Sequence, residues 1–514
     1  MSDAQANAVA ELLRIAPVVD RLGDLFATAG HELYLVGGSV RDALMGRLGN
    51  DLDFTTSARP DDIEDLLREF TRGVPGAAVW DIGKAFGTIG ARVPQSPTET
   101  AATAGATNAE HTDAEGGDEE KQAAYWLIEI TTFRAEVYRE DSRKPEVSYG
   151  DTIDGDLVRR DFTVNAMAIR LPERTFVDPH HGLRDLASGV LRTPGTPQQS
   201  FSDDPLRMMR AARFTAQLST PQIRFAPAPE VVAAMIDMAE RIDIISAERV
   251  RDELCKLVLT DNPRPGLNLL VETGLAARVL PELPALRLEV DEHHRHKDVY
   301  EHSMTVLEQS IALERIRGSA PDLVGRLAAL LHDIGKPPTR KYADGNRVTF
   351  HHHDVVGAKM VKKRLRALRF STDEIKDIAH LVELHLRFHG YSDGLFDDAR
   401  GWTDSAVRRY VRDAGDQLER LHILTRADCT TRNQRKAARL RRAYDDLERR
   451  IAELAGQEEL DAIRPDLNGE QIMSLLGVKP GPVVGRAYKF LLDARLEHGP
   501  LGEERATELL QQWW

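Results

Sequence analysis

Apolar residues in the first third of the chain gather in short runs that predict β-strands. Four runs are rich in β-branched or aromatic residues and lie between turn-forming residues. They cover residues 33–36 (LYLV), 51–56 (DLDFTT), 87–93 (GTIGARV) and 125–133 (YWLIEITTF). Apolar residues at helical spacing predict one helix that ends near Gly30 and a second over residues 60–70. The first part of the chain is therefore expected to form a small sheet with accompanying helices.

After about residue 195 the apolar positions recur almost entirely at helical spacing. The clearest segments are PLRMMRAARFTAQL, PEVVAAMIDMAERI and AERVRDELCKLVL. No internal repeat of fixed period is present. The pattern predicts an α+β protein, with a sheet-containing head followed by a long all-helical part.

Length and charge change this picture in two ways. A chain of 514 residues is too long for one compact core, so two to four domains are expected. The formal net charge of −14 argues against a protein that coats nucleic acid by bulk electrostatics. Residues 97–122 carry a local charge of −6 and are interpreted as a disordered insertion, whereas residues 401–450 carry +5. A local basic face for a nucleic acid therefore remains open.

The cysteine count and the hydropathy of the sequence bear on the cellular compartment of the protein. Cys255 and Cys429 are the two cysteines of the chain, which is a poor basis for a disulfide framework or a cysteine-ligated zinc site. The amino terminus lacks a basic-then-apolar signal pattern, and no run approaches the 18 or more apolar residues of a membrane span. We expect a cytoplasmic protein without a membrane partner.

The first candidate site is a pair of aspartates on one predicted strand. Asp51 and Asp53 alternate along the strand, so both carboxylates point to one face. Two acids held in this way suit a hard divalent cation, most often Mg²⁺ with phosphate oxygens completing its shell. Glu129 on an adjacent strand is the best candidate for a third ligand. A solvated strand edge is the alternative, and for an isolated pair of this kind it is the commoner outcome.

A glycine pair precedes these aspartates. Gly37 and Gly38 permit a tight turn whose N–H groups can approach a triphosphate, and Arg41 adds a cation. A Gly-Gly pair is more often a simple turn. Here Gly38 lies 13 residues before Asp51, which is a short connection within one small fold.

With these residues in view, the chain resembles the superfamily of class II tRNA nucleotidyltransferases and bacterial poly(A) polymerases. The resemblance rests on five ordered motifs. They are GGSVRDALMG with NDLDFTT, FRAEVYREDSRKPEVSYG at 133–150, LVRRDFTVNAMAI at 157–169, VDPHHGLRDLASGVLRTPG at 177–195, and FSDDPLRMMRAARF at 201–214. The resemblance implies a head of polymerase-beta type and template-independent nucleotide addition to RNA.

By this resemblance Asp51, Asp53 and Glu129 are the catalytic carboxylates that hold Mg²⁺. The implied nucleotide-binding residues are Gly37, Gly38, Arg41, Arg160, Asp161, Asn165, Asp204, Arg207, Arg210 and Arg213. Asp204 and Arg207 read the base of CTP or ATP in the family, and a shared helix face would suit a spacing of three. The family usually has Glu-Asp where this chain has Asp203-Asp204, but the base-reading aspartate is kept. Residues 134–150 match the family's flexible loop, which favours addition of C, C and A over C and C alone.

A second candidate site lies among the histidines. Of the 17 histidines, 11 fall between residues 293 and 389. Imidazole and carboxylate groups from several helices can hold a divalent transition metal with room for water. His-Asp adjacency alone is common and usually carries no function.

The phrase LLHDIGK resembles the HD phosphohydrolase superfamily, in which a metal activates water against phosphate esters. The resemblance places the ligands at His302, His332, Asp333 and Asp428, with Lys336, His353 and His385 available for substrate or a second metal. The identity of the metal stays open, and an inactive spacer domain is the alternative.

Together these resemblances predict an enzyme that adds CCA to the 3′ end of tRNA, with a possible phosphohydrolase activity in the HD domain. The expected division has five segments: a helix over 1–30, the head over 31–170, an all-α neck and body over 171–290 for nucleotide selection and RNA binding, an all-α HD domain over 291–430, and a helical tail over 431–514 for possible tRNA contact. Poly(A) polymerase is one alternative, because it shares the head motifs. A phosphohydrolase or nucleotide sensor whose head only binds nucleotide is an alternative of another class.

Overall fold

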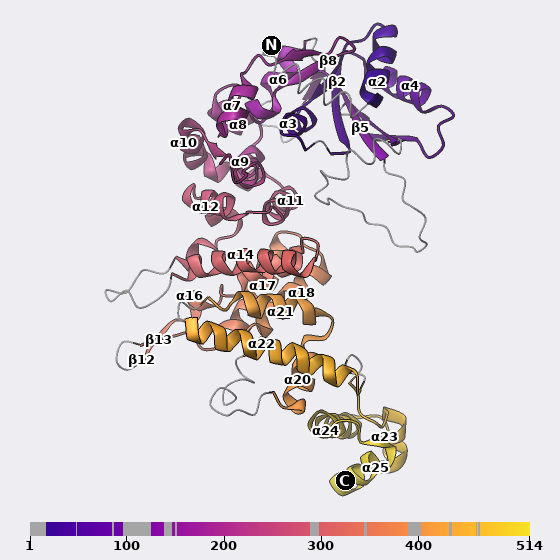
Figure 1. Ribbon diagram of the computed structural model, residues 1–514, viewed down its shortest axis with the longest axis vertical. Coiled ribbons are helices and arrows are strands. Elements are labelled where there is room, and N and C mark those ends of the chain that lie inside the picture. The colour runs from indigo at the N-terminus through magenta and orange to yellow at the C-terminus, as the bar shows by residue number, and fades with distance from the viewer. Residues whose placement is uncertain are drawn as a thin grey trace. The chain divides into compact units, whose positions relative to one another are not determined.

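A seven-stranded mixed sheet forms the head of the chain in a computed structural model (Figure 1). The structure describes residues 17–47, 49–84, 87–95, 125–137, 146–149, 152–287, 298–343, 347–388, 402–430, 434–458, 460 and 463–514. The acidic segment 97–122 lies outside these residues. The strand order is β3-β4-β5-β2-β1-β8-β9. The strands are β1 (Leu33–Val36), β2 (Asp51–Thr56), β3 (Ala78–Gly83), β4 (Thr88–Pro94), β5 (Tyr125–Thr132), β8 (Ala168–Leu171) and β9 (Thr175–Val177).

The central pair of this sheet is parallel and the other pairs are antiparallel. Strand β2 lies beside β5, and the register places Asp53 opposite Glu129. Helices α2 (Pro17–Thr28) and α4 (Pro60–Thr71) pack against the sheet, α2 on β1 and β8, α4 on β3 to β5. Because strand side chains alternate, the residues that face these helices are apolar and the aspartates point to the other face.

The part of the chain that follows β9 is helical, as the sequence predicts, apart from two pairs of short strands. Strands β10 (Val190–Leu191) and β11 (Ala226–Pro227) pair in parallel, and β12 (Lys341–Ala343) and β13 (Arg347–Thr349) form a hairpin. Before β9, another antiparallel pair, β6 (Arg134–Val137) with β7 (Glu146–Tyr149), lies within the predicted flexible loop. The expectation of an all-α neck and HD domain therefore holds except at these strands. Each is too short for the spacing of its apolar residues to distinguish a strand from a helix.

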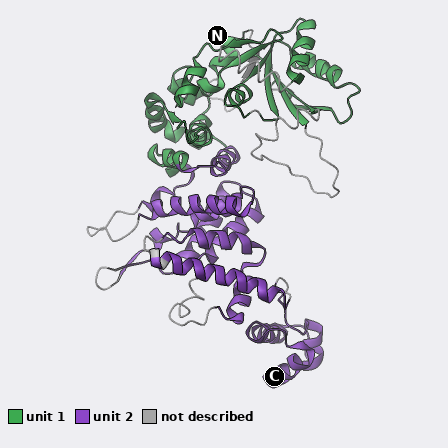
Figure 2. Cartoon of the chain, in the orientation of Figure 1, with its two compact units in different colours: residues 1–246, 265–278 green, residues 247–264, 279–514 purple. Residues whose placement is uncertain are grey.

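The chain divides into two compact units (Figure 2). The first contains residues 1–246 and 265–278, and the second contains residues 247–264 and 279–514. The remaining helices of the first unit are α3 (Gly38–Leu44), α6 (Ile153–Val158), η2 (Thr163–Asn165), α7 (Gly182–Ser188), α8 (Pro197–Asp203), α9 (Leu206–Gln217), α10 (Pro229–Met238), η3 (Ala239–Ile244) and α13 (Leu275–Val279), with most of α12 (Arg264–Glu272). The finer division into five segments stays a prediction.

The second unit is built from helices in the order α11 (Ala247–Val258), η4 (Pro284–Leu286), α14 (Val299–Arg317), α15 (Leu323–Leu331), α16 (Lys336–Thr339), α17 (His353–Ala367), α18 (Thr372–Leu384), α20 (Asp404–Ala414), η5 (Gly415–Gln417), α21 (Leu418–Ala427), α22 (Gln434–Ala455), α23 (Gly469–Leu476), α24 (Pro482–His498) and α25 (Gly502–Trp513). No helix of the described residues is both long and apolar enough to cross a membrane.

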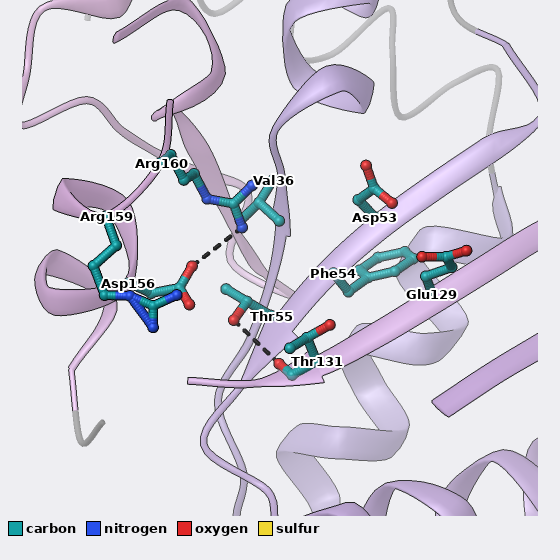
Figure 3. Close-up of a pocket in the computed structure, with 9 residues that line it drawn as sticks. All are labelled: Val36, Asp53, Phe54, Thr55, Glu129, Thr131, Asp156, Arg159 and Arg160. Atoms are coloured by element: carbon teal, nitrogen blue, oxygen red, sulfur yellow. Dashed lines mark hydrogen bonds and ion pairs between the residues drawn. The ribbon is translucent and has the colours of Figure 1, made fainter. Parts of the chain in front are cut away.

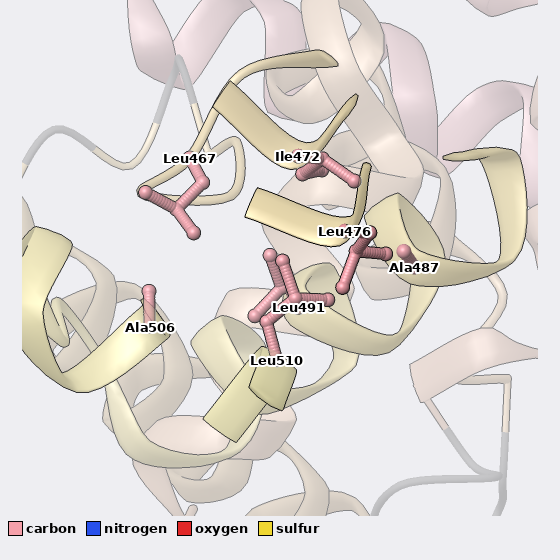
Figure 4. Close-up of a cluster of buried hydrophobic side chains, with 7 residues drawn as sticks. All are labelled: Leu467, Ile472, Leu476, Ala487, Leu491, Ala506 and Leu510. Atoms are coloured by element: carbon pink, nitrogen blue, oxygen red, sulfur yellow. The ribbon is translucent and has the colours of Figure 1, made fainter. Parts of the chain in front are cut away.

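The last three helices share an apolar cluster of their own. Seven buried residues form it: Leu467, Ile472, Leu476, Ala487, Leu491, Ala506 and Leu510 (Figure 4). An asparagine at position 468 caps α23 by accepting from two backbone N–H groups, and Gly477 ends that helix in the left-handed conformation. The tail therefore contains the capping and the buried surface that a small helical module needs.

Candidate functional site

The turn between β1 and α3 requires glycine and is tied directly to the aspartate strand. Gly37 has φ 70° and ψ −132°, and a Cβ atom there would lie 2.8 Å from Nη1 of Arg160. The hydroxyl of Ser39 accepts from the Asp53 N–H at 2.9 Å and donates to the Asp51 carbonyl at 3.1 Å. The turn and the two aspartates are therefore held together, and Ser39 is a positioning residue that the sequence patterns did not single out.

Asp53 and Glu129 lie in register on neighbouring parallel strands and line one cavity (Figure 3). Burial raises the pKa of Asp53, and Asp51 raises it further, while Arg160 and Arg41 oppose the shift. Burial, Asp53 and Asp51 likewise raise the pKa of Glu129. Three carboxylates that repel one another in this way offer oxygen ligands to a hard divalent cation. Asp51, Asp53 and Glu129 thus lie on one face of the sheet, and their role as cation ligands stays a prediction.

The cavity beside these carboxylates has a volume of about 240 Å³. Its other wall comes from α6 and the residues after it, where Asp156, Arg159 and Arg160 lie (Figure 3). Nη2 of Arg160 donates to Asp156 at 3.1 Å. The cavity thus places cationic groups opposite carboxylates, which is the charge arrangement that a nucleotide with bound divalent cation needs.

Four of the predicted nucleotide-binding residues, Arg41, Asn165, Asp161 and Arg210, form one hydrogen-bonded network. Arg41 donates to the Asn165 side chain at 2.6 Å, and Asn165 donates to Asp161 at 2.9 Å. Arg210 donates to the other oxygen of Asp161 through Nε at 2.7 Å. Although burial alone would raise the pKa of Asp161, Arg210 and Asn165 hold it far below its ordinary range. Arg210, expected to contact phosphate, is thus paired with Asp161 in the structure.

Asp204 and Arg207 do not share one helix, which corrects the expectation drawn from their spacing. Asp204 ends α8 with extended backbone angles (φ −142°, ψ 99°), and α9 begins at Leu206. The cause is Pro205, because the residue before a proline is pushed out of the helical region. Arg207 donates to the Ser200 hydroxyl at 2.9 Å and to the Arg159 carbonyl.

Arg213 is buried on the same helix. Its guanidinium lies 4.2 Å from the centre of the Phe214 ring, and it donates to Gln217 at 2.5 Å. In the flexible loop, residues 138–145 lie outside the described part of the chain. A contact between Arg213 and phosphate stays a prediction.

The second site brings together the four predicted ligands and the two histidines predicted for substrate or a second metal, all in the second unit. Two groups have ligand atoms that all lie within 4.8 Å of one another: His302, His332 and Asp428, and Asp333, His353 and His385. Asp333 lies between the groups. One of its oxygens is 3.2 Å from Nε2 of His332 and the other is 3.3 Å from Nε2 of His353. No other group of this kind occurs among the described residues, the head carboxylates included.

Hydrogen bonds outside the cluster leave each Nε2 free to face it. The Nδ1–H groups of His332, His353 and His385 donate to backbone carbonyls at 2.8, 2.8 and 2.6 Å. His302 uses its Nδ1 atom with the Thr430 hydroxyl at 3.0 Å. Metal-ligating histidines are oriented in this way in general. Thr430 is a further positioning residue that spacing alone did not reveal.

Two more observations fit divalent cations at this cluster. Nitrogen atoms of imidazole pairs approach to 3.2 Å, and the Oδ1 atom of Asp333 is buried without a hydrogen bond. Burial lowers the pKa of His385 to about 4, whereas Asp333 raises the pKa of His332 despite its burial. Lys336 donates to Oδ2 of Asp333 at 2.6 Å. A Cβ atom at Gly335 would lie 2.0 Å from the His353 carbonyl. Glycine there permits the segment that follows α15, with His332 and Asp333, to approach the start of α17.

Comparison with known protein families matches most of the chain. The poly A polymerase head domain matches residues 33–123 and 105–192. The probable RNA and SrmB-binding site of polymerase A matches residues 224–286, and the HD domain matches residues 299–433. The matched segments contain the head carboxylates and the histidine and aspartate cluster, whereas Asp204, Arg207, Arg210 and Arg213 lie between two matched segments.

Curated relatives fall into the same group. The A-adding tRNA nucleotidyltransferase of Deinococcus radiodurans is 36% identical over 369 residues, covering 70% of this chain and 79% of that protein. The multifunctional CCA protein of Alkalilimnicola ehrlichii is 33% identical over 364 residues, covering 70% and 75%. The CCA-adding enzyme of Levilactobacillus brevis is 38% identical over 248 residues, which is 48% of this chain and 51% of that enzyme.

A solved structure has the same fold. The crystal structure of the Bacillus stearothermophilus CCA-adding enzyme in complex with CTP aligns with a TM-score of 0.62 and 23% identity, covering 100% of this chain and 98% of that one. With the head sheet, the helical second unit and the HD cluster in place, this chain belongs to the family of tRNA nucleotidyltransferases, metal-dependent enzymes with a poly(A) polymerase head, here followed by an HD domain.

Proposed function

We propose that this enzyme adds C, C and A to the 3′ end of tRNA, with CTP and ATP as substrates and release of pyrophosphate. The observation that carries the proposal is the register of Asp53 and Glu129 on adjacent strands, beside the glycine turn and Arg160. The names of the relatives support the choice of tRNA, since they include CCA-adding and A-adding enzymes.

In this proposal the carboxylates of Asp51, Asp53 and Glu129 hold Mg²⁺. Mg²⁺ held there would lower the pKa of an attacking hydroxyl and would offset the charge that develops on pyrophosphate. The N–H groups of Gly37 and Gly38 bind the triphosphate from the other side, with the help of Arg41.

Base selection is assigned to Asp204 and Arg207. Arg207 presents guanidinium donors and Asp204 presents an acceptor, which together can distinguish C and A from G and U. Their placement supports this role, since Arg207 is held by Ser200 and by the backbone next to Arg160. The network of Arg41, Asn165, Asp161 and Arg210 fixes the surrounding groups before a nucleotide arrives.

The direct experiment uses tRNA that lacks its 3′ CCA, labelled CTP or ATP, and Mg²⁺, followed by sequencing of the products. Addition that stops after CCA supports the proposal. Addition of a single A, and only to tRNA that already ends in CC, would assign the A-adding activity that the Deinococcus radiodurans relative is named for. A long A tail would assign a poly(A) polymerase, and absence of any incorporation would leave the head as a nucleotide-binding module.

A second activity is favoured by the HD cluster. We infer that it holds divalent transition-metal ions and hydrolyses phosphate esters, with Lys336 placed for the phosphate. Cations bound there would polarise a phosphate ester and lower the pKa of a water molecule. The test is hydrolysis of a phosphomonoester and of a cyclic phosphodiester with Ni²⁺, Co²⁺ or Mn²⁺, compared with the Asp333→Asn variant. Equal rates for both proteins would assign the cluster a structural role.

A cytoplasmic location completes the proposal. Cys255 and Cys429 are both free thiols, which suits a reducing compartment.

A further inference from the structure

Three large apolar side chains lie in solvent on the sheet face that carries the catalytic carboxylates. Trp80 is 39% exposed, Ile82 is 44% exposed and Leu127 is 38% exposed. Trp80 and Ile82 belong to β3, a strand that the sequence did not predict. Large apolar groups gathered in the open next to a catalytic site are unusual for a monomeric protein and indicate a binding surface.

The strand register places these side chains beside the carboxylates. Trp80 pairs with Gly90, Gly90 with Glu129, and Glu129 with Asp53, so one row crosses four adjacent strands. Residues opposite one another on neighbouring strands share a face and lie about 4.5–5.5 Å apart. Leu127 lies two residues from Glu129, hence on the same face.

Gly90 allows the two bulky side chains to lie flat across β4. A Cβ atom at that position would be 2.6 Å from Cδ1 of Ile82 and 2.8 Å from Cε2 of Trp80. Both side chains therefore extend over the glycine, in the direction of Glu129 on the next strand. The result is an apolar shelf formed by Trp80, Ile82 and Leu127.

The rest of this face is covered. At β1 and β8 the side chains of Tyr34, Val36 and Ala168 are buried against Leu157 of α6 and Ala166. The opposite face of the sheet is covered by α2 and α4. In the part of the chain that the structure describes, the shelf is thus an open approach to the carboxylates across the sheet, in addition to the cavity beside Asp53 and Glu129.

A cation accompanies the shelf. Arg92 lies on the same face of β4, two residues from Gly90, and is exposed. Its guanidinium lies 5.2 Å from the centre of the Tyr125 ring, and no carboxylate among the described residues pairs with it. An aromatic and apolar platform next to an unpaired arginine matches the chemistry of single-stranded nucleic acid, whose bases stack and whose phosphates need cations.

We propose that the shelf binds the 3′-terminal nucleotides of the RNA that is being extended, with a base stacked on Trp80 and a phosphate on Arg92. The inference rests on the proposed nucleotide addition. In that reaction the attacking hydroxyl enters opposite the leaving pyrophosphate. Gly37, Gly38 and Arg41 hold the triphosphate on the β1 side of the carboxylates, so the RNA end enters from the β5 side, where the shelf lies.

Steady-state incorporation separates this role from a structural one. For Trp80→Ala we expect the KM for RNA to rise about tenfold or more, with the KM for CTP and the kcat little changed, because stacking on one aromatic ring contributes this much. Trp80→Phe keeps a ring and restores the KM. Ile316→Ala is the matched control, since that side chain is 79% exposed in the second unit. Unchanged KM for RNA in Trp80→Ala would overturn the proposal.

A binding measurement keeps the test independent of catalysis. RNA with 2-aminopurine as its 3′-terminal base loses fluorescence when that base stacks, and we expect Trp80→Ala to abolish this quenching. If Trp80→Ala fails to fold, Gly90→Ala replaces it in this experiment. The added Cβ atom displaces Trp80 and Ile82, so we expect this variant to weaken the quenching. Arg92→Gln lowers the salt dependence of RNA binding by about one phosphate contact.

The remaining outcomes are also decisive. If the wild-type protein incorporates no nucleotide, the proposed function fails, and the quenching experiment still reports on the shelf. If Trp80→Ala alters the oligomeric mass and leaves RNA binding intact, the shelf is an interface between copies of this chain, and the RNA assignment is overturned.

Discussion

The candidate metal ligands of this enzyme are arranged differently at its two sites. In the head, Asp51, Asp53 and Glu129 lie on an open sheet face, and their ligand atoms do not converge within the distance that defines the second cluster. In the HD cluster, six ligands converge, with His332, Asp333 and His385 at most 1% exposed. The first arrangement lies on an open sheet face, whereas the second is mostly enclosed, with His302 and Asp428 its most accessible members at 12% and 15% exposure.

The difference is visible in the electrostatics. In the head, burial and repulsion between neighbouring carboxylates raise the pKa values of Asp53 and Glu129. In the HD cluster the histidines hold the pKa of Asp333 well below its ordinary range, despite burial that would raise it. A site that takes its cation together with its substrate can be loosely built, while a site that retains its cations must be preorganised.

The largest effect should come from removing one carboxylate from each site. Asp53→Asn should reduce nucleotide incorporation by about a thousandfold or more and leave phosphate-ester hydrolysis intact. Asp333→Asn should do the reverse. Rates of both reactions in both variants check this. Loss of both activities in one variant, with unchanged circular dichroism, would contradict the independence of the two sites.

Removal of a buried ion pair between two helices of the HD domain should lower the free energy of unfolding of the second unit alone. Arg326 on α15 is buried with Glu314 on α14, and it also donates to the carbonyls of Val258 and Thr260. Glu314→Ala leaves an unpaired buried guanidinium, and we expect about 3–5 kcal/mol of destabilisation by denaturant unfolding.

The control for that substitution lies on the same helix. Glu308→Ala removes a half-exposed partner of Arg264, for which about 0–1 kcal/mol is expected. An equal loss of stability in the two variants would show that burial is not what distinguishes the HD scaffold.

Cation binding should stabilise only the preorganised site. At a free metal concentration one hundredfold above Kd, Ni²⁺ or Mn²⁺ should stabilise the second unit by about 2.7 kcal/mol, and Mg²⁺ without nucleotide should have little effect on the first unit. Thermal unfolding with and without metal measures this. The same Ni²⁺-dependent shift in His353→Ala as in wild type would exclude binding at the cluster.

The smallest expected effect concerns a residue outside both sites, where burial acts alone. Burial raises the pKa of the Cys255 thiol to about 12, as burial lowers that of His385. The thiol form is favoured on folding, so its contribution to stability is present below pH 9 and is lost as the pH rises toward 12. At pH 9 alkylation of Cys255 in the native protein should be at least about tenfold slower than in denaturant, as measured by mass spectrometry. Equal rates would indicate an accessible thiolate.

Of the seven strands of the head sheet, the sequence predicts β1, β2, β4 and β5 and misses β3, β8 and β9. Strands β1 and β2 have the predicted bounds, β4 is displaced by one residue, and β5 ends one residue earlier than predicted. Strand β3 was missed because Asp81 and Gly83 interrupt its apolar pattern and none of its residues is buried. The shelf on β3 was therefore invisible from sequence.

The sequence names candidate site residues but not their arrangement. The resemblance gave four HD ligands and two further candidates, yet the position of Asp333 between two groups depends on five helices meeting, α14, α15, α17, α18 and α21. The pairing of Arg210 with Asp161 and the break at Pro205 likewise depend on tertiary contacts and on backbone sterics, which a spacing of three residues cannot report.

The glycine at position 90 also limits how this enzyme can change over time. Any side chain there excludes the present positions of Trp80 and Ile82, and loss of those two residues leaves the glycine exposed on a bare strand. Among descendants of this sequence we expect positions 80, 82 and 90 to be substituted together, as one inherited unit.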